Sequence, residues 1–227
     1  MSAPDPCDVS MPYRIPPITQ ALLWSNVVVL GLQLLLGDRL FLPFMLWPLG
    51  EYPLGYVDGA LQSVGFLPWQ LVTYGFLHGG LGHMMFNMLA LWMFGAQMEM
   101  LWGSRRYALY YFVCVIGAGL VQVAVVTWGV AQGAQPHPTV GASGGVFGLL
   151  LAFGMMFPNR QVMLLIPPIP MKARTLVIAY GALELYMGVT GSRSGIAHFA
   201  HLGGMLFGFL LIQYWRGRWP FERRRRE

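Results

Sequence analysis

The chain has 227 residues, of which 56% are hydrophobic and only 10% are charged, and its formal net charge at pH 7 is +5. Soluble domains carry about 25% charged residues, so this composition excludes a soluble globular protein and indicates an integral membrane protein. At about 20 residues per span, the length accommodates about six transmembrane helices with short connections. Residues 1–17 are polar and proline-rich, without the pattern of a signal peptide, and we expect them to form a cytoplasmic tail.

Hydropathy along the chain predicts an all-α polytopic membrane protein whose core, residues 18–215, is a six-transmembrane-helix bundle. The predicted spans are residues 18–37, 74–100, 107–130, 143–157, 175–189 and 196–215. Residues 38–73 are too apolar for a solvent loop and too interrupted by proline and glycine for a span. We therefore expect them to form a loop at the membrane interface, where aromatic rings prefer to lie. Residues 216–227 are predicted to be a basic cytoplasmic tail.

Basic residues are distributed unequally between the two sides of this predicted bundle. With a cytoplasmic N-terminus, twelve of the 14 basic residues fall inside, and only Arg39 and Arg193 fall outside. Cytoplasmic loops carry such an excess, so we expect both termini of this multi-pass protein inside, in the inner (cytoplasmic) membrane of a cell. The four arginines at 223–226 fit an anchor at anionic lipid better than a nucleic-acid site.

A serine and a histidine lie at matched, shallow depth on the outer side of two spans. Ser143 begins the fourth span, and His201 lies about one turn into the sixth. Small residues recur every four positions beside them, namely Gly144, Gly148 and Ala152 in the fourth span and Ala200, Gly204 and Gly208 in the sixth. Such stripes let helix backbones approach closely, so facing stripes would bring the serine and the histidine together. A serine beside a base can act as a nucleophile, whereas ordinary helix packing and a serine cap explain the same pattern without chemistry.

The second span contributes further polar side chains. His83 and Asn87 are four residues apart and share one helix face, from which both can donate hydrogen bonds to an anionic oxygen. The alternative is that Asn87 bridges to a neighbouring helix and His83 caps a turn. His78 lies near the start of the span, where it can line a watery entrance.

Metal and carboxylate chemistry find less support. Four histidines can converge, but no His-Glu-x-x-His zinc motif occurs, and no aspartate lies in any predicted span. The carboxylates within the predicted spans are Glu99, near the cytoplasmic end, and Glu184. The depth of Glu184 makes it a poor partner for His201. We therefore expect a serine–histidine dyad without an acid, and no metal or other cofactor.

Taken together, these motifs resemble those of rhomboid intramembrane serine proteases. The run GASG at 141–144 matches the Gly-x-Ser-Gly motif of that family, and AHLGG at 200–204 is similar to its final-span motif. The spacing of His78, His83 and Asn87 resembles that of the family's second span, and PWQLVTY at 68–74 resembles bacterial members. The resemblance covers the six-span core from about residue 22 to residue 215.

The resemblance implies an intramembrane serine endopeptidase that cleaves single-span membrane proteins near the outer membrane surface. Its partners would be these substrates and the lipid bilayer, with no nucleic acid and no metal. Ser143 would be the nucleophile and His201 the general base, in preference to His198. His83, Asn87 and the backbone N–H of Ser143 would hold the oxyanion.

The resemblance also implies residues that line the site. Phe147 stands four residues after the serine, where many family members have a tyrosine packed against the catalytic histidine. A phenylalanine can pack its ring against the histidine as a tyrosine does, but it cannot make a contact through a hydroxyl group. Gly141 and His78 are expected to line the site as well.

Two other classes of function remain as alternatives. A non-catalytic rhomboid-like protein would hold membrane clients for other machinery, but such proteins lack the serine or the histidine, and this chain has both. A small transporter would show repeats between its two halves, and none is visible in the sequence.

Overall fold

The computed structural model describes residues 15–57, 60–163, 168–191 and 197–217, and the statements below refer to these ranges. The helices are α1 (Pro17–Leu36), α3 (Leu81–Ala90), α4 (Ala96–Trp102), α5 (Ser104–Ala131), α6 (Ser143–Met156), α7 (Ala173–Thr190) and α8 (His198–Trp215). A π-helical turn, η3 (Leu91–Gly95), joins α3 to α4 without a loop. Of the predicted tails, 1–17 and 216–227, residues 1–14 and 218–227 lie outside the described residues.

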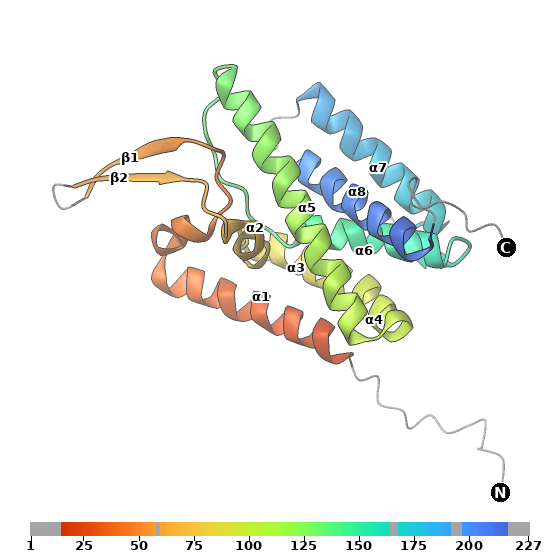
Figure 1. Ribbon diagram of the computed structural model, residues 1–227. Coiled ribbons are helices and arrows are strands. Elements are labelled where there is room, and N and C mark those ends of the chain that lie inside the picture. The colour runs from red at the N-terminus through yellow and green to blue at the C-terminus, as the bar shows by residue number, and fades with distance from the viewer. Residues whose placement is uncertain (1–14, 58–59, 164–167, 192–196, 218–227) are drawn as a thin grey trace, which may run out of the picture.

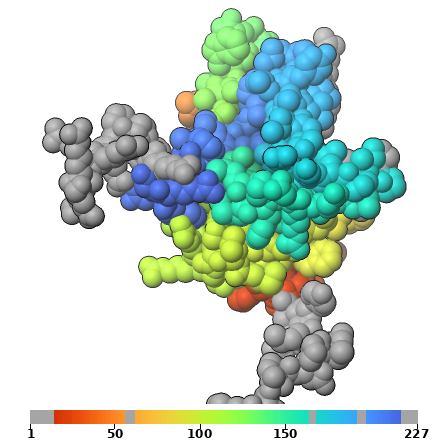
Figure 2. Space-filling model, turned by 90° about the vertical axis from the view of Figure 1, so that its right-hand side faces the viewer, coloured from red at the N-terminus to blue at the C-terminus, as the bar shows by residue number. Residues whose placement is uncertain are grey.

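The helix α8 occupies the centre of the bundle, where it packs against α5, α6 and α7 (Figure 1). On the other side of α5 lies α1, which contacts α3, η3 and α4. In Figure 2 the surface around α6 lies between that of α7 above and that of α4 below. The start of α1 and the end of α8 lie on the same side of the bundle, at the right of Figure 1.

The predicted interfacial connection contains regular structure. A 3₁₀ helix, η1 (Asp38–Phe44), precedes an antiparallel hairpin of β1 (Glu51–Val57) and β2 (Ala60–Gly65). This hairpin extends away from the helices at the left of Figure 1. Two short helices, α2 (Gln70–Thr73) and η2 (Tyr74–Phe76), lead from it towards α3.

The second predicted span is wrong in its first residues. We expected a helix from residue 74, but α3 begins at Leu81. The reason is local, because Gly80 has φ of +140°, a conformation that a continuing α-helix does not accept. A second small hairpin, β3 (Gln161–Met163) with β4 (Pro170–Lys172), joins α6 to α7, so the helical fold carries two hairpins that the sequence did not predict.

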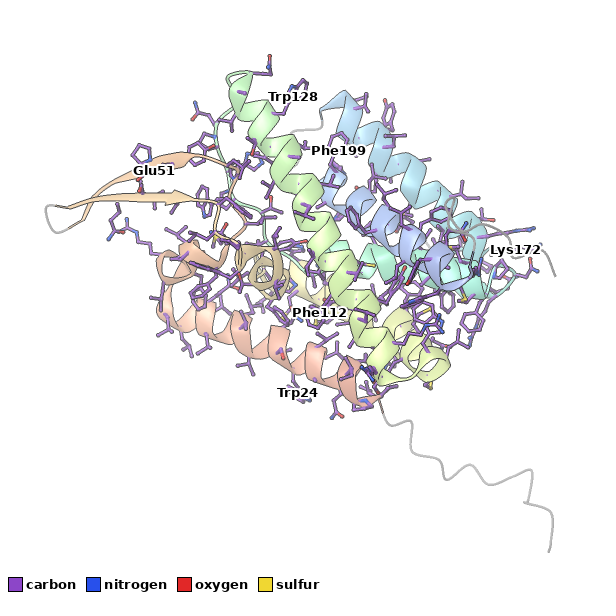
Figure 3. All side chains as sticks on the ribbon, viewed as in Figure 1. Trp24, Glu51, Phe112, Trp128, Lys172 and Phe199 are labelled. Atoms are coloured by element: carbon purple, nitrogen blue, oxygen red, sulfur yellow. The ribbon has the colours of Figure 1, made fainter. Side chains whose placement is uncertain are left out.

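Large apolar side chains cover much of the outer surface. Trp24 on α1 is 62% exposed and Trp128 near the end of α5 is 70% exposed, and both project away from the bundle (Figure 3). Soluble monomers rarely expose apolar surface so widely, so this is the surface of helices that face lipid. Among the described residues, α1 and α5 are long and apolar enough by themselves to cross a membrane, and α6 is a shorter apolar helix.

The two stripes of small residues face each other, as the sequence predicted. A Cβ added to Gly204 would overlap the carbonyl oxygen of Gly144, and one added to Gly148 would come within 3.2 Å of the carbonyl oxygen of Gly204. The helices α6 and α8 are therefore in backbone contact. This contact sets the relative position of the first turns of both helices.

Candidate active site

Ser143 and His201 meet where α6 and α8 begin. Ser143 is the first residue of α6, and Nε2 of His201 lies 2.8 Å from its Oγ. His201 is buried, whereas Ser143 is partly open. The first N–H groups of a helix lack partners within the helix, so the backbone N–H of Ser143 is available to a ligand at the same point. The close backbones explain how a short hydroxyl reaches an imidazole on another helix.

The ring of Phe147 fixes the plane of the imidazole. Phe147 lies one turn after Ser143 on α6, and its ring is stacked on His201 with centroids 4.1 Å apart and an angle of 5° between the planes. Tyr180 of α7 packs edge-on against the ring of Phe147, with centroids 6.1 Å apart. Aromatic stacking therefore holds His201 without the hydroxyl group of a tyrosine.

Our expectation for Glu184 is wrong. Its Oε2 lies 2.9 Å from Nδ1 of His201, although the N–H of that ring is not well directed at the oxygen. Glu184 reaches His201 because the first residue of α8 lies beside Gly188 of α7. A Cβ added to Gly188 would be 3.5 Å from Cβ of His198. Because α8 begins level with Gly188, residues one turn further into each helix, Glu184 and His201, share one depth.

The same carboxylate also contacts His198. Nδ1 of His198 lies 2.7 Å from Oε2 of Glu184, so one oxygen faces two imidazoles. All three side chains are buried. Glu184, His198 and His201 offer ligand atoms within 4.8 Å of one another, which is also the composition of a metal site.

The spacing of these atoms favours protons between them rather than an ion. Zinc bonds of about 2.0 Å in a tetrahedral site put neighbouring ligand atoms about 3.3 Å apart. The two distances from Oε2 of Glu184, 2.7 and 2.9 Å, are shorter and have the length of charge-assisted hydrogen bonds. These three residues are the best candidates for a metal among the described residues, and their spacing suits hydrogen bonding better.

His83 stands against the loop that precedes Ser143. Gly141 has φ of +129°, and a Cβ there would lie 2.9 Å from Nε2 of His83 and 3.7 Å from Oγ of Ser143. The backbone N–H of Gly79 donates to Nδ1 of His83 over 3.3 Å, which leaves the proton of the ring on Nε2. His83 thus presents an N–H donor beside Gly141 and close to Ser143.

Asn87 and His78 occupy different positions relative to the serine. Asn87 is buried, lies on the same face of α3 as His83 and donates from Nδ2 to the carbonyl oxygen of His83 over 2.9 Å. His78 is buried with its ring edge-on to His83, at a centroid distance of 5.1 Å. The side-chain amide of Gln33 on α1 pairs with both the N–H and the C=O of His78. The ring of His78, whose backbone is held by Gln33, therefore packs against His83 and helps to fix its position.

A large cavity opens over these groups. Its volume is about 1280 Å³, and its walls come from α3, η3, α6, α7 and the segment 137–140. Ser143, His201, His83, Asn87 and Phe147 line it, together with apolar side chains such as Met93 and Leu176. Small-molecule pockets occupy about 300–1,000 Å³, so this cavity has room for a segment of polypeptide.

Comparison with known proteins agrees with this architecture. The Rhomboid domain family model matches residues 66–218, which contain the serine, both histidines at the start of α8 and the polar face of α3. The chain belongs to the rhomboid family. Rhomboid-family proteins are all-helical, polytopic membrane proteins, which accounts for the apolar outer surface.

Several rhomboid relatives are similar over most of this chain. Rhomboid protein 1, mitochondrial, of Saccharomyces cerevisiae is 30% identical over 200 residues, which cover 87% of this chain and 53% of that protein. RHOMBOID-like protein 4 of Arabidopsis thaliana is 33% identical over 152 residues, covering 63% and 33% respectively. Rhomboid protease GluP of Bacillus subtilis is 32% identical over 142 residues, covering 62% and 25%. This rhomboid chain therefore spans about half or less of the length of these relatives.

Sequence reasoning undervalued two residues of this rhomboid site. Glu184 was set aside because it was judged to lie too deep to reach His201. Tyr180, which lines the cavity, was not considered. The two residues are four positions apart on α7, so they share one helix face, and this spacing was the available signal that α7 turns a polar face to the site.

Proposed function

We propose that this chain is an intramembrane serine endopeptidase that cleaves single-span membrane proteins near the outer surface of the bilayer. The observation that carries the proposal is the 2.8 Å contact between Oγ of Ser143 and Nε2 of His201 at the wall of a 1280 Å³ cavity. His201 takes the proton of Ser143, and the serine attacks the peptide carbonyl. Water then hydrolyses the acyl-enzyme, with His201 as the proton donor and acceptor.

The developing oxyanion would be held by donors on two elements. Nε2–H of His83 lies beside Gly141, the backbone N–H of Ser143 begins α6 two residues later, and Asn87 supplies an amide on the face of α3 that bears His83. Preorganised donors of this kind stabilise the tetrahedral intermediate because they need no rearrangement when the charge appears. His78 would keep His83 in place.

The substrate would enter as an unwound segment of a transmembrane helix. The cavity has walls from both α3–η3 and α7, and most of its lining is apolar. A helix in lipid exposes no peptide bond for attack, so residues that weaken helices near the outer end of the substrate would favour cleavage. No metal or other cofactor enters this scheme.

For the membrane topology we propose six crossings, made by α1, α3 with α4, α5, α6, α7 and α8, with both termini in the cytoplasm of a cell. Basic residues at one end of the bundle support this orientation: Arg160 donates to Gln97 over 2.8 Å, and Arg106 lies 4.1 Å above the ring of Trp215. Arg39 follows the opposite end of α1. The site would then be near the non-cytoplasmic surface of an inner cell membrane.

The test uses purified full-length protein in liposomes with a model single-span substrate. Wild type is expected to cleave the substrate and to react at Ser143 with a fluorophosphonate, whereas Ser143→Ala and His201→Ala are expected to lose cleavage. Equal cleavage by wild type and Ser143→Ala would sink the proposal. A wild type that binds such substrates without cleaving them would identify a non-catalytic client-binding protein.

A further inference from the structure

Glu184 is the buried group of the site that a serine–histidine dyad leaves unused. Its carboxylate lies on α7, 7% exposed, and one of its oxygens faces Nδ1 of both His198 and His201. An ionised carboxylate is too costly to bury unless hydrogen bonds or a counter-charge compensate its lost hydration. His198 supplies a charge-assisted hydrogen bond over 2.7 Å, and Nδ1 of His201 lies 2.9 Å from the same oxygen, although its N–H is not well directed at it.

The carboxylate determines which nitrogen of His201 carries the proton. A carboxylate only accepts hydrogen bonds, so the Nδ1 that faces it at 2.9 Å is the protonated nitrogen of a neutral ring. Nε2 then has a free lone pair and faces Oγ of Ser143 at 2.8 Å. This is the tautomer that a general base for Ser143 needs, and the opposite tautomer would present a second donor to the hydroxyl.

We infer that Glu184 is a positioning residue for the proposed reaction, which holds His201 in its reactive tautomer and stabilises the imidazolium formed when Ser143 gives up its proton. This inference rests on the proposed function. The proton moves from Oγ of Ser143 to Nε2 of His201 and stays there until it passes to the leaving amine. Glu184 accepts hydrogen bonds throughout and takes no proton.

His198 holds the carboxylate in turn. Its Nδ1 lies 2.7 Å from the same oxygen, and it begins α8 one turn before His201. Phe147 stacks on the face of His201, and Glu184 faces its Nδ1 and so sets its tautomer. The N–H of His201 is poorly directed at the oxygen, and catalytic hydrogen bonds that are poorly aligned in a free enzyme often tighten when substrate binds.

The decisive variant is Glu184→Gln, which keeps the shape and an acceptor oxygen but removes the charge. Hydrogen bonds to charged groups are stronger than neutral ones by about 1.4 kcal/mol, so kcat and the rate of fluorophosphonate labelling are expected to fall together by about tenfold or more. KM is expected to stay unchanged, because Glu184 does not touch the substrate. A wild-type kcat in Glu184→Gln would overturn the inference.

Glu99→Gln is the matched control. Glu99 is also a buried helical carboxylate, and it accepts hydrogen bonds from the backbone N–H groups of Ile18 and Thr19 at the start of α1. Its replacement is expected to lower the melting temperature and to leave kcat unchanged at temperatures where the variant is folded. Glu184→Gln is expected to show the opposite pattern, and equal losses of stability and kcat in both variants would mean that Glu184 is only structural.

A pair of variants at His198 tests the outer contact, and remains informative if Glu184→Gln does not fold. His198→Asn places an amide N–H close to the position of Nδ1, whereas His198→Ala provides no donor. We expect kcat of His198→Ala to fall several-fold and that of His198→Asn to stay near wild type. Identical kcat values for wild type and both variants would overturn the role of His198.

Further measurements distinguish a failure of this inference from a failure of the proposed protease function, and they test whether the three residues bind a metal instead. If wild type and Ser143→Ala cleave equally, the proposed function itself fails. If Ser143→Ala is inactive while Glu184→Gln is fully active, only the inference fails. Stoichiometric zinc in the isolated wild type, with loss of activity on chelation, would show that Glu184, His198 and His201 bind a metal and would also overturn it.

Discussion

Gly204→Ala is expected to separate Ser143 from His201 without touching either residue. The new Cβ would lie 2.8 Å from the carbonyl carbon and 3.3 Å from Cα of Gly144, and closer still to its carbonyl oxygen. Non-bonded carbons prefer about 3.5–4.0 Å, so α6 and α8 would have to move apart by about 1 Å. Both sides of this contact are backbone, so no side-chain rotation relieves it.

The displacement acts directly on the serine and the base. Moving the helices apart by about 1 Å would stretch the 2.8 Å contact to about 3.8 Å, beyond the range of about 2.6–3.2 Å in which a base works. Misplacement of this size costs about 100-fold in rate. The measurements are cleavage of a single-span substrate in liposomes, fluorophosphonate labelling of Ser143 and a melting curve.

Two further glycines supply the controls for Gly204→Ala. Gly31→Ala is the matched change, because a Cβ at this position in α1 has nothing within 4 Å, and it is expected to behave as wild type. Gly208→Ala meets the side chains of Tyr110 and Cys114 one turn further from the site, so it is expected to lose stability but to keep more labelling. A folded Gly204→Ala variant that labels at the wild-type rate would refute the reasoning.

Three further changes have expected outcomes. Gly141→Ala is expected to lower kcat about 100-fold, because its Cβ would lie 2.8 Å from Cε1 of His83 and displace a proposed oxyanion donor. Phe147→Ala is expected to lower kcat about tenfold, because the imidazole loses the ring stacked on it, while Phe147→Tyr stays near wild type. Gln33→Leu is expected to lower the free energy of unfolding by about 3 kcal/mol, measured by chemical denaturation in detergent, because both backbone groups of His78 lose their partners.

Each of these changes has an outcome that contradicts it. Wild-type cleavage by Gly141→Ala would show that His83 does not contact the reacting oxygen. Equal kcat values for Phe147→Ala and wild type would show that α7 and α8 hold the imidazole without the stacked ring. Gln20 lies exposed on α1, so Gln20→Leu is expected to change stability by less than about 0.5 kcal/mol. An equal loss of stability in Gln20→Leu and Gln33→Leu would mean that the pairing with His78 contributes nothing.

The parts of the fold that follow from helix periodicity and small residues were predictable. The spans predicted at residues 18–37, 107–130 and 143–157 agree closely with α1, α5 and α6. The four-residue spacing of Gly144 and Gly148 indicated which face of α6 meets α8, because in lipid close backbone contact needs small residues. The pairing of Ser143 with His201 followed from that face. The orientation in the membrane and the roles of the residues stay predictions.

The part of the site that the sequence did not yield is the register between α7 and α8. We judged Glu184 to be too deep for His201, although the predicted spans put Glu184 five residues before the end of one span and His201 five residues after the start of the next. In the structure α8 begins beside Gly188, and a register of one turn decides whether the carboxylate on α7 reaches the base on α8. Hydropathy locates the ends of a span only to within about 2–4 residues, so the sequence does not settle that register. A buried glutamate one turn from the level of a histidine on the next helix is therefore to be counted as a partner until its register is known.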